Sequence, residues 1–444
     1  MTPASPGRHG AGTVIAGIPR AGIADDHASR PLNVCFVSAD YPAASTARAG
    51  AGGIGTHTYT LARAIAGLGH TVVVITETET KVERYSDGPV EVYALPRGSQ
   101  RMWKLGRWVP VSWIRRSFAV WRTFRLLHHQ YCFDLVSFPD GYGEGLRYSY
   151  SPLVPFAVQL FGPASLVQRW DGRRVPRPRA RVEAWVEQRP ASRASLLIAA
   201  TRRFADLVTR EWSVDPDRIR IIPNPLDLQL FRPSNGHDRG PKTVLFVGHL
   251  QRLKGLHTLA VAIPLVVARH PDVEFQFVGN DTNSAPDGTS MKLFLKKYLS
   301  ERGVLGHVRF VDPVPQRELV SFYQRCTLFV LPSLHDVYPN AVLEAMACAR
   351  PSIVSSTVGT SEIMIDGETG FVLPPDDSNA LAGAISRVLS MPRSSCDEIG
   401  ARARRTVEGL CAAPIVAAQT VDAYRDVLSN RAIARIPTPF GGDL

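Results

Sequence analysis

Residues 243–279 read TVLFVGHLQRLKGLHTLAVAIPLVVARHPDVEFQFVG and contain one complete β–α–β pattern. The apolar runs at 243–249 and 273–279 are short and rich in Val and Phe, which predicts two buried strands. The apolar residues near 256–269 have the spacing and length of a helix. A strand, a helix and a second strand in this order predict a parallel sheet with helices on its faces.

The same alternation occupies most of the chain. Further strands are predicted at 33–39, 71–76, 133–138, 155–161, 195–200, 308–312, 328–333, 351–356 and 370–375, with a helix near 56–68. Residues 218–242 are rich in Pro, Asn, Gly and Asp, which predicts a linker between two such series. We therefore expect an α/β protein with two doubly wound, Rossmann-like domains that face each other across a ligand-binding cleft.

Changes in composition along the sequence also predict the domain boundaries. Residues 1–30 are rich in Gly, Ala and Pro without periodicity, which predicts a disordered tail. We expect the first domain to cover 31–230 and the second to cover 231–412. The helical pattern at 413–430 is expected to cross back to the first domain, and 431–444 is expected to be a second tail.

The composition narrows the class of protein. The 444 residues are 45% hydrophobic and 20% charged, as in globular proteins, and the chain is too long for one ordinary core. The six cysteines are scattered without CxxC spacing, which predicts reduced thiols and a cytoplasmic location. The longest apolar stretch, at 259–268, is too short to span a bilayer.

The net charge of +11 is concentrated in one segment. Between Val92 and Phe133 the chain carries eight Lys or Arg, no acidic residue, and four of its seven tryptophans. This mixture suits an anionic membrane surface, and equally a solvated helix face with packed tryptophans. We expect residues 97–125 to contact the inner face of a membrane. Nucleic acid is not an expected partner, because no recognition motif accompanies the charge.

A glycine-rich loop follows the first predicted strand. Gly50, Gly52 and Gly55 formally match GxGxxG, with Glu77 in the place of the ribose acid. However, Glu77 lies 27 positions after Gly50, beyond the usual spacing of about 20 in a dinucleotide site. The loop is therefore either a stretched nicotinamide or flavin site or a place where bare backbone approaches another anion.

Two segments of the second half carry candidate ligand-binding residues. The segment 247–255 presents His249, Arg252 and Lys254 before a helix, where cations suit a diphosphate. The segment LHDVYPNAVLEAMACARPS, at 334–352, places Asp336 eight positions before Glu344 at the start of an apolar helix. These charges are either solvated loop residues or parts of a site, since carboxylates accept hydrogen bonds from vicinal hydroxyls and helix starts favour phosphate.

Taken together, these segments resemble the retaining glycosyltransferases of family 4, also called glycosyl transferases group 1, which have the GT-B fold. The similarity runs from about Asn33 to Asn430. It rests on GGIG, GLGHTVVVIT, IIPNPLD, VGHLQRLKG, the segment 334–352 and GTSEIMIDGETGFVLPPDD, in this order. The resemblance implies a retaining, metal-independent hexosyltransferase without a cofactor. Its donor would be a nucleotide-diphosphate sugar, and its acceptor a hydroxyl of a glycan or glycolipid, lipid-linked or destined for a cell-surface polysaccharide.

The resemblance also implies roles for individual residues. Asp336 would contact the sugar hydroxyls, Glu344 the ribose and Lys254 the donor phosphate, with Asp336 and Lys254 as the catalytic pair. The donor-binding residues implied in this way are Gly52, Gly53, Gly55, His249, Arg252, Lys254, Asp336, Tyr338, Asn340, Ala341, Glu344 and Glu362. No metal site is expected, and Asp215-Pro216-Asp217 is interpreted as a turn and not as a metal-binding DxD motif.

Four positions depart from the family pattern, one of them Ala349 in place of a customary glycine. Asp336 stands where glutamate is usual, His249 where an arginine is expected, and Phe161 where a histidine is frequent. A sugar-nucleotide-binding protein with impaired catalysis is therefore an alternative. A dinucleotide-dependent oxidoreductase built on the glycines of the first domain is a less favoured one.

Overall fold

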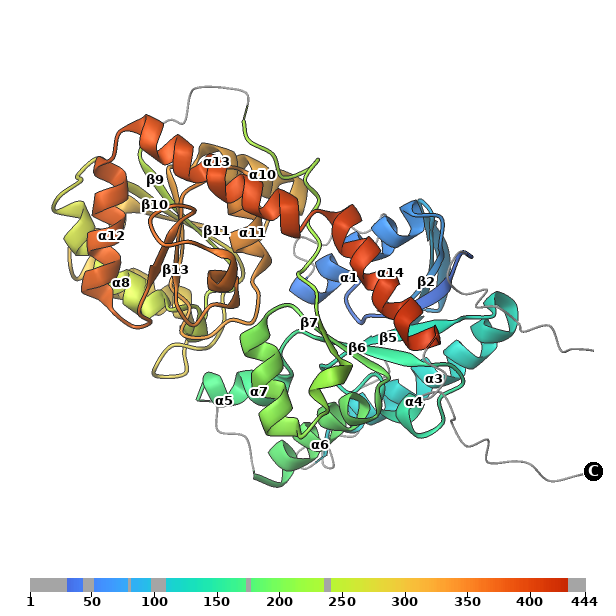
Figure 1. The fold of residues 1–444 in the computed structure, drawn as a ribbon. Coiled ribbons are helices and arrows are strands. Elements are labelled where there is room, and N and C mark those ends of the chain that lie inside the picture. Colours follow the sequence, from blue (N-terminus) through green and yellow to red (C-terminus); the bar gives the residue numbers. More distant parts are fainter. Residues whose placement is uncertain are drawn as a thin grey trace, which may run out of the picture.

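The computed structural model describes residues 30–42, 52–78, 81–96, 109–172, 177–234 and 241–429. These residues form two α/β domains, at the lower right and the upper left of Figure 1. Both predicted tails lie outside the described residues, apart from Arg30. Residues 97–108 of the predicted membrane segment and Gly50 of the glycine loop lie outside them as well.

An eight-stranded sheet forms the centre of the first domain. Its strands are β1 (Asn33–Val37), β2 (Thr71–Thr78), β3 (Glu83–Asp87), β4 (Val90–Pro96), β5 (Leu135–Pro139), β6 (Phe156–Leu160), β7 (Leu196–Ala199) and β8 (Ile219–Ile221). They are ordered β3-β4-β2-β1-β5-β6-β7-β8, and only the β3–β4 pair is antiparallel. The β3–β4 hairpin was not predicted, because the edge strand β3 carries charged and exposed residues in place of an apolar run.

Helices cover both faces of this sheet. They are α1 (Gly53–Gly67), α3 (Val111–Tyr131), α4 (Leu146–Tyr150), α5 (Ala164–Trp170), α6 (Arg177–Arg193) and α7 (Arg202–Trp212). Residues of β1 point alternately to the two faces, so that Val34 packs in the cluster with Leu61 of α1. Cys35 packs in the other cluster, with Phe124 of α3. Both faces are therefore buried, which explains the continuous apolar runs of the strands.

The second domain contains a fully parallel six-stranded sheet. Its strands are β9 (Thr243–Val247), β10 (Glu274–Val278), β11 (Val308–Val311), β12 (Leu328–Leu331), β13 (Ser352–Ser355) and β14 (Phe371–Leu373). Its helices are α8 (Leu256–Val267), α9 (Met291–Ser300), α10 (Gln316–Arg325), α11 (Asn340–Ala347), α12 (Ser378–Ser390) and α13 (Arg393–Leu410). The strand order β11-β10-β9-β12-β13-β14 is that of a doubly wound sheet, and the predicted fold class is confirmed.

The chain passes between the domains twice, and the two crossings lie side by side. Leu226 forms a β-bridge with Ala412, and its N–H donates to the carbonyl of Cys411 at 2.7 Å. After this point α14 (Ala413–Ser429) leaves the second domain and packs against α1 of the first (Figure 1). Val421 and Tyr424 of α14 are buried in the same apolar cluster as Leu61.

Candidate functional site

The strand orders of the two sheets indicate where a ligand would bind. The order reverses between β1 and β5 in the first sheet and between β9 and β12 in the second. Loops at such reversals diverge at the carboxyl ends of the strands and leave room for ligands. The helices that follow β1 and β12, α1 and α11, start close together at the domain junction, where Asn340 Nδ2 donates to the carbonyl of Gly53 at 3.5 Å. The junction therefore joins the two predicted ligand-binding edges.

Lys254 and Asp336 form an ion pair at this junction. Lys254 follows β9 and Asp336 follows β12, and Lys254 Nζ contacts Asp336 Oδ2. Both side chains are largely covered, with 18% and 14% of their surface exposed. Gly255 makes the close approach of the two loops possible, since its φ is +70° and an added Cβ would lie 1.8 Å from the carbonyl oxygen of Pro332. The two residues expected to be catalytic are therefore in direct contact.

The N-terminus of α11 lies beside this pair. Pro339 is the N-cap, and no side chain caps the first amides of the helix, which include that of Ala341. The turn is held by Asn224 of the linker motif, whose Nδ2 donates to Tyr338 O at 3.2 Å and to Asn340 Oδ1 at 2.9 Å. A helix start without a side-chain cap can donate to an anion.

Two of the residues predicted to contact the sugar donor have buried side chains. Tyr338 is 6% exposed, and its hydroxyl lies 3.6 Å from Cys411 Sγ at the domain crossing. Glu344 is 5% exposed and accepts hydrogen bonds from Tyr323 Oη at 2.7 Å and Gln316 Nε2 at 3.3 Å. Burial raises the pKa of Glu344 above its usual value. A contact between Glu344 and a donor ribose stays a prediction.

The other two cationic candidates lie on the surface of the second domain. His249 is exposed next to Lys254, and partial desolvation together with the Lys254 charge lowers the pKa of its imidazole. Arg252 is exposed as well, and its backbone N–H donates to Ser284 Oγ at 3.1 Å. One guanidinium nitrogen of Arg252 reaches the first domain, where it would lie 3.6 Å from a Cβ on Gly172. With a pKa lowered from its usual value, His249 is neutral at pH 7, so that Arg252 is the better candidate of the two for contact with an anion.

Glu362 connects the two domains. Its carboxylate accepts hydrogen bonds from the backbone N–H groups of Arg202 and Arg203, both at 3.0 Å. These amides open α7 of the first domain, whereas Glu362 belongs to the 3-10 helix Gly359–Ile363 of the second. The carboxylate therefore caps a helix across the junction. The predicted contact of Glu362 with a donor stays a prediction.

Further contacts across the junction were not apparent from the sequence. The rings of Trp170 on α5 and His335 stack at 5.1 Å with an interplanar angle of 16°. Gly162 has a φ of +105°, and an added Cβ would lie 2.9 Å from Val337 Cγ2 of the second domain. Neither pair belongs to a motif, because the two partners of each contact are far apart in the chain.

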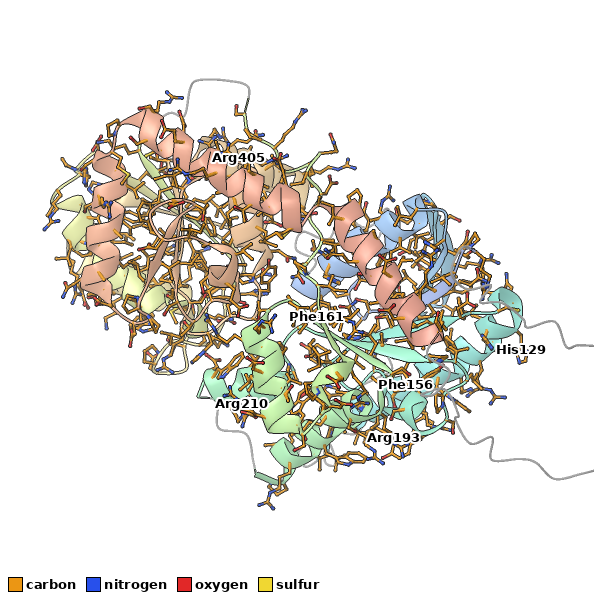
Figure 2. The ribbon with its side chains drawn as sticks, in the orientation of Figure 1. His129, Phe156, Phe161, Arg193, Arg210 and Arg405 are labelled. Carbon is orange, nitrogen blue, oxygen red and sulfur yellow. The ribbon has the colours of Figure 1, made fainter. Side chains whose placement is uncertain are left out.

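Phe161 lies where the two domains meet, as Figure 2 shows. Its ring packs edge-on against His57 of α1, with the centroids 4.8 Å apart. Burial lowers the pKa of His57 to about 3, so the ring is neutral. The imidazole of His57 therefore lies beside residue 161, where the family frequently has a histidine.

Asp140 is a buried carboxyl group that sequence analysis missed. It lies directly after β5 and is 2% exposed, and its Oδ2 accepts from the N–H groups of Phe161 at 3.1 Å and Gly162 at 3.0 Å. Its Oδ1 is buried and has no hydrogen-bond partner among the described residues. Burial raises the pKa of Asp140 to about 7. Its place after a buried strand, followed by glycine, was the available signal.

The start of α1 holds a carboxylate of the protein itself. Gly53 and Gly55 lie in the first turn of α1, and the N–H of the N-cap residue Gly52 donates to Asp40 Oδ2 at 2.5 Å. A dinucleotide pyrophosphate would need this same helix start. The geometry therefore disfavours a dinucleotide site in the first domain.

The predicted turn at 215–217 is observed. Asp215 Oδ1 accepts from the N–H of Asp217 at 3.0 Å and caps the 3-10 helix Pro216–Arg218. Over the described ranges, no three His, Cys, Asp or Glu residues are grouped so that they could hold a metal ion. Metal independence itself stays a prediction.

Comparisons with known protein families cover both domains. Residues 228–406 match the family described as glycosyl transferases group 1, and residues 52–225 match the glycosyl transferase 4-like domain. The chain is 29% identical to D-inositol 3-phosphate glycosyltransferase of Paenarthrobacter aurescens, over 59% of this chain and 64% of that protein. It is 30% identical to the enzyme of the same name from Frankia alni, over 56% and 63%. The matched part thus spans less than two thirds of either relative.

Solved structures show the same architecture. Sucrose-phosphate synthase from Thermosynechococcus elongatus superposes with a TM-score of 0.73 at 23% identity, covering 89% of this chain and 99% of that one. HepE from Anabaena, in complex with UDP and glucose, superposes with a TM-score of 0.65 at 17% identity, covering 89% and 100%. With matched family models on both domains and this shared architecture, the chain belongs to the glycosyl transferases group 1, the family-4 glycosyltransferases with the GT-B fold.

Proposed function

We propose that the chain transfers a hexose from a nucleotide-diphosphate sugar to a hydroxyl group of an acceptor, with retention of the anomeric configuration. The observation that carries this proposal is the Lys254–Asp336 ion pair, placed at the domain junction between the starts of α8 and α11. Family membership supports it, and so do the nucleotide-sugar ligands of related folds. HepE, for example, was solved with UDP-glucose.

In this proposal the junction stabilises the leaving diphosphate. Lys254 and the first amides of α11 donate to the phosphates, and charge that develops on the leaving oxygen meets fixed donors. Asp336 then accepts hydrogen bonds from sugar hydroxyls, and Glu344 from the ribose. The first domain brings the acceptor hydroxyl to the same face of the sugar. Contacts between the domains exclude water and favour transfer over hydrolysis.

We further propose that the acceptor is a glycan or a glycolipid, lipid-linked or a precursor of a cell-surface polysaccharide. The predicted membrane contact of residues 97–125 supports a cytoplasmic protein that works at the inner face of a membrane. Five of the six cysteines are buried, as expected for packed thiols in a reducing compartment. None of the described helices combines the length and the apolarity that a bilayer-spanning segment needs.

The test combines donor binding with product analysis. Nucleotides and nucleotide sugars are screened for thermal stabilisation of the protein, and the stabilising donor is then offered a panel of glycan acceptors with and without EDTA. We expect stabilisation by one nucleotide-diphosphate sugar and a product whose anomeric configuration, read by NMR, is that of the donor. EDTA should leave the rate unchanged.

Lys254→Ala tests the site, and Lys242→Ala is the matched control on the surface of the same domain. We expect Lys254→Ala to weaken donor binding and lower kcat, whereas Lys242→Ala should change neither. Equal rates for both variants would show that the site is placed wrongly. Donor binding without transfer to any acceptor would favour the alternative of a binding protein with impaired catalysis. Stabilisation by nicotinamide or flavin nucleotides would favour the oxidoreductase.

A further inference from the structure

Three helices of the first domain pack in sequence and direct arginines outward. α4 contacts both α3 and α6, and all three lie on the lower side of the first domain in Figure 1. The outward arginines of the two long helices are exposed or half-buried, namely Arg115, Arg122, Arg125, Arg181, Arg189 and Arg193. Among the described residues none of these six forms a salt bridge, in contrast to Arg116 and Arg179 of the same helices.

Within these three helices, no exposed acidic side chain balances this charge. α3 and α4 contain no Asp or Glu. The two acidic residues of α6, Glu183 and Glu187, are 1% and 0% exposed and point into the domain. The surface of the three helices is therefore of one sign, which keeps cations together at an energetic cost unless an anionic partner is present.

Large apolar side chains lie among the arginines. Leu126 is 73% exposed and Trp185 is 48% exposed, and Phe118 and Tyr150 are exposed to a similar degree as Trp185. Arg147 of α4 lies over the ring of Trp121, with 4.1 Å between the guanidinium carbon and the ring centroid. We call the outward surface of α3, α4 and α6 the arginine–aromatic face.

We propose that the arginine–aromatic face docks the protein onto an anionic phospholipid surface. Arginine heads can meet lipid phosphates, while the aliphatic Leu126 and the ring of Trp185 enter the headgroup region. Single-stranded nucleic acid fits less well, because it needs free aromatic faces for stacking. Among the described residues of this face, Arg147 covers Trp121 and Phe118, and Arg189 and Arg193 cover Tyr150, so that Trp185 is the one exposed ring left for stacking.

The position of the arginine–aromatic face indicates how a lipid-linked acceptor would reach the site. This step rests on the proposed function. Trp113 on α3 packs edge-on against Tyr142, with the ring centroids 5.5 Å apart. Tyr142 follows Asp140, whose carboxylate holds the Phe161–Gly162 turn at the domain junction. The docking face therefore borders the acceptor side of the site, and a lipid-linked acceptor held in the membrane would reach it from there.

Vesicle co-sedimentation tests the docking without donor or acceptor. The full chain is mixed with vesicles of phosphatidylcholine alone or of phosphatidylcholine with phosphatidylglycerol. We expect binding only to the anionic vesicles, and its loss at high salt. The triple variant Arg115→Ser/Arg122→Ser/Arg125→Ser should partition roughly 100-fold more weakly, from the typical contribution of a cation near a membrane.

The charge-matched control is Arg269→Ser/Arg302→Ser/Arg309→Ser on the second domain, which should bind like the parent. Leu126→Ser, at a site too exposed to affect folding, should weaken binding without changing the salt dependence. Equal binding to neutral vesicles, or full binding by the triple variant, would overturn the proposal. So would tight binding of a short RNA that displaces the protein from vesicles. Transfer to a soluble acceptor is measured separately, so that a failure of docking and a failure of the proposed activity are distinguishable.

Discussion

Removal of the Glu362 carboxylate should loosen the junction between the two domains. In Glu362→Ala the N–H groups of Arg202 and Arg203 lose their acceptors, which lie 3.0 Å away in the parent. Loss of a capping side chain costs about 0.5–2 kcal/mol, and loss of a negative charge at a helix start about 0.3–1 kcal/mol. Together these terms come to about 1–3 kcal/mol, which shifts the ratio of joined to separated domains by roughly 5- to 150-fold.

Two measurements report this change in the donor-free protein. Hydrogen exchange of the first α7 amides should accelerate, and the radius of gyration from small-angle scattering should increase. The helix itself should persist, because Thr201 Oγ1 still accepts from the N–H of Phe204 at 3.1 Å. Glu368→Ala is the matched control, since Glu368 is exposed in the neighbouring turn and its carboxylate has no partner within the described ranges.

The outcome distinguishes two possible roles of Glu362, a contact with the sugar donor and a cap that joins the domains. If exchange and scattering match the parent while donor affinity falls, Glu362 acts as a donor contact, and the inference of an interdomain cap is wrong. If exchange and scattering change and donor affinity falls only in proportion, the cap is the main role. Glu362→Gln should lie between the parent and the alanine variant, because its amide oxygen still accepts but carries no charge.

Three other substitutions test separate parts of the structure. Gly255→Ala should lower the Tm markedly, because its φ is +70° and the Cβ would meet the carbonyl oxygen of Pro332. The control Gly383→Ala, with open space in α12, should stabilise the protein by about 0.5–1 kcal/mol. Asp140 has a folded-state pKa of about 7, above its usual 3.8, so the native state holds the proton more tightly and stability falls as pH rises between these values. Urea unfolding of Asp140→Asn at about pH 5 and about pH 8 should lack that fall, and an unchanged pH dependence would contradict the assignment. Glu344→Gln should weaken donor binding by about 1.5–3 kcal/mol, as expected for a lost charged hydrogen bond, with little change in kcat. Calorimetry would measure the Kd of the donor for this variant and the parent.

The fold was predictable where burial was complete. β9 and β10 are recognisable as uninterrupted apolar runs, because helices cover both faces of the second sheet. β3 is an edge strand with exposed, charged residues, and its sequence ERYSD does not differ from that of a loop. The helix α3 was ambiguous for a related reason, because its outward face combines arginines with apolar residues and hides the period of its buried side.

The sequence named the candidate residues by position, but it could not predict their side-chain contacts. Lys254 and Asp336 meet because β9 and β12 are neighbours in the sheet, which brings the loops after them together. The sequence could not show that Glu362 accepts from amides 159 and 160 positions earlier. Nor could it show that the hydroxyl of Tyr338 contacts Cys411. The first contact depends on how the domains sit together, and the second on how the end of α13 packs near the start of α11, and no local pattern encodes either arrangement.

The Lys254–Asp336 pair explains how two charged side chains remain at the domain junction without a ligand. A partly buried lysine or aspartate alone would carry an uncompensated charge, and its side chain would turn toward water. Because they are paired, the side chains of Lys254 and Asp336 stay at the junction with only 18% and 14% of their surface exposed. In the proposed site, a diphosphate that drew Lys254 away would leave Asp336 without a hydrogen-bond donor, and the sugar hydroxyls of the same ligand would supply donors. Under the proposed function, phosphate binding and sugar binding would therefore be coupled through one ion pair, which would favour the intact nucleotide sugar over either fragment.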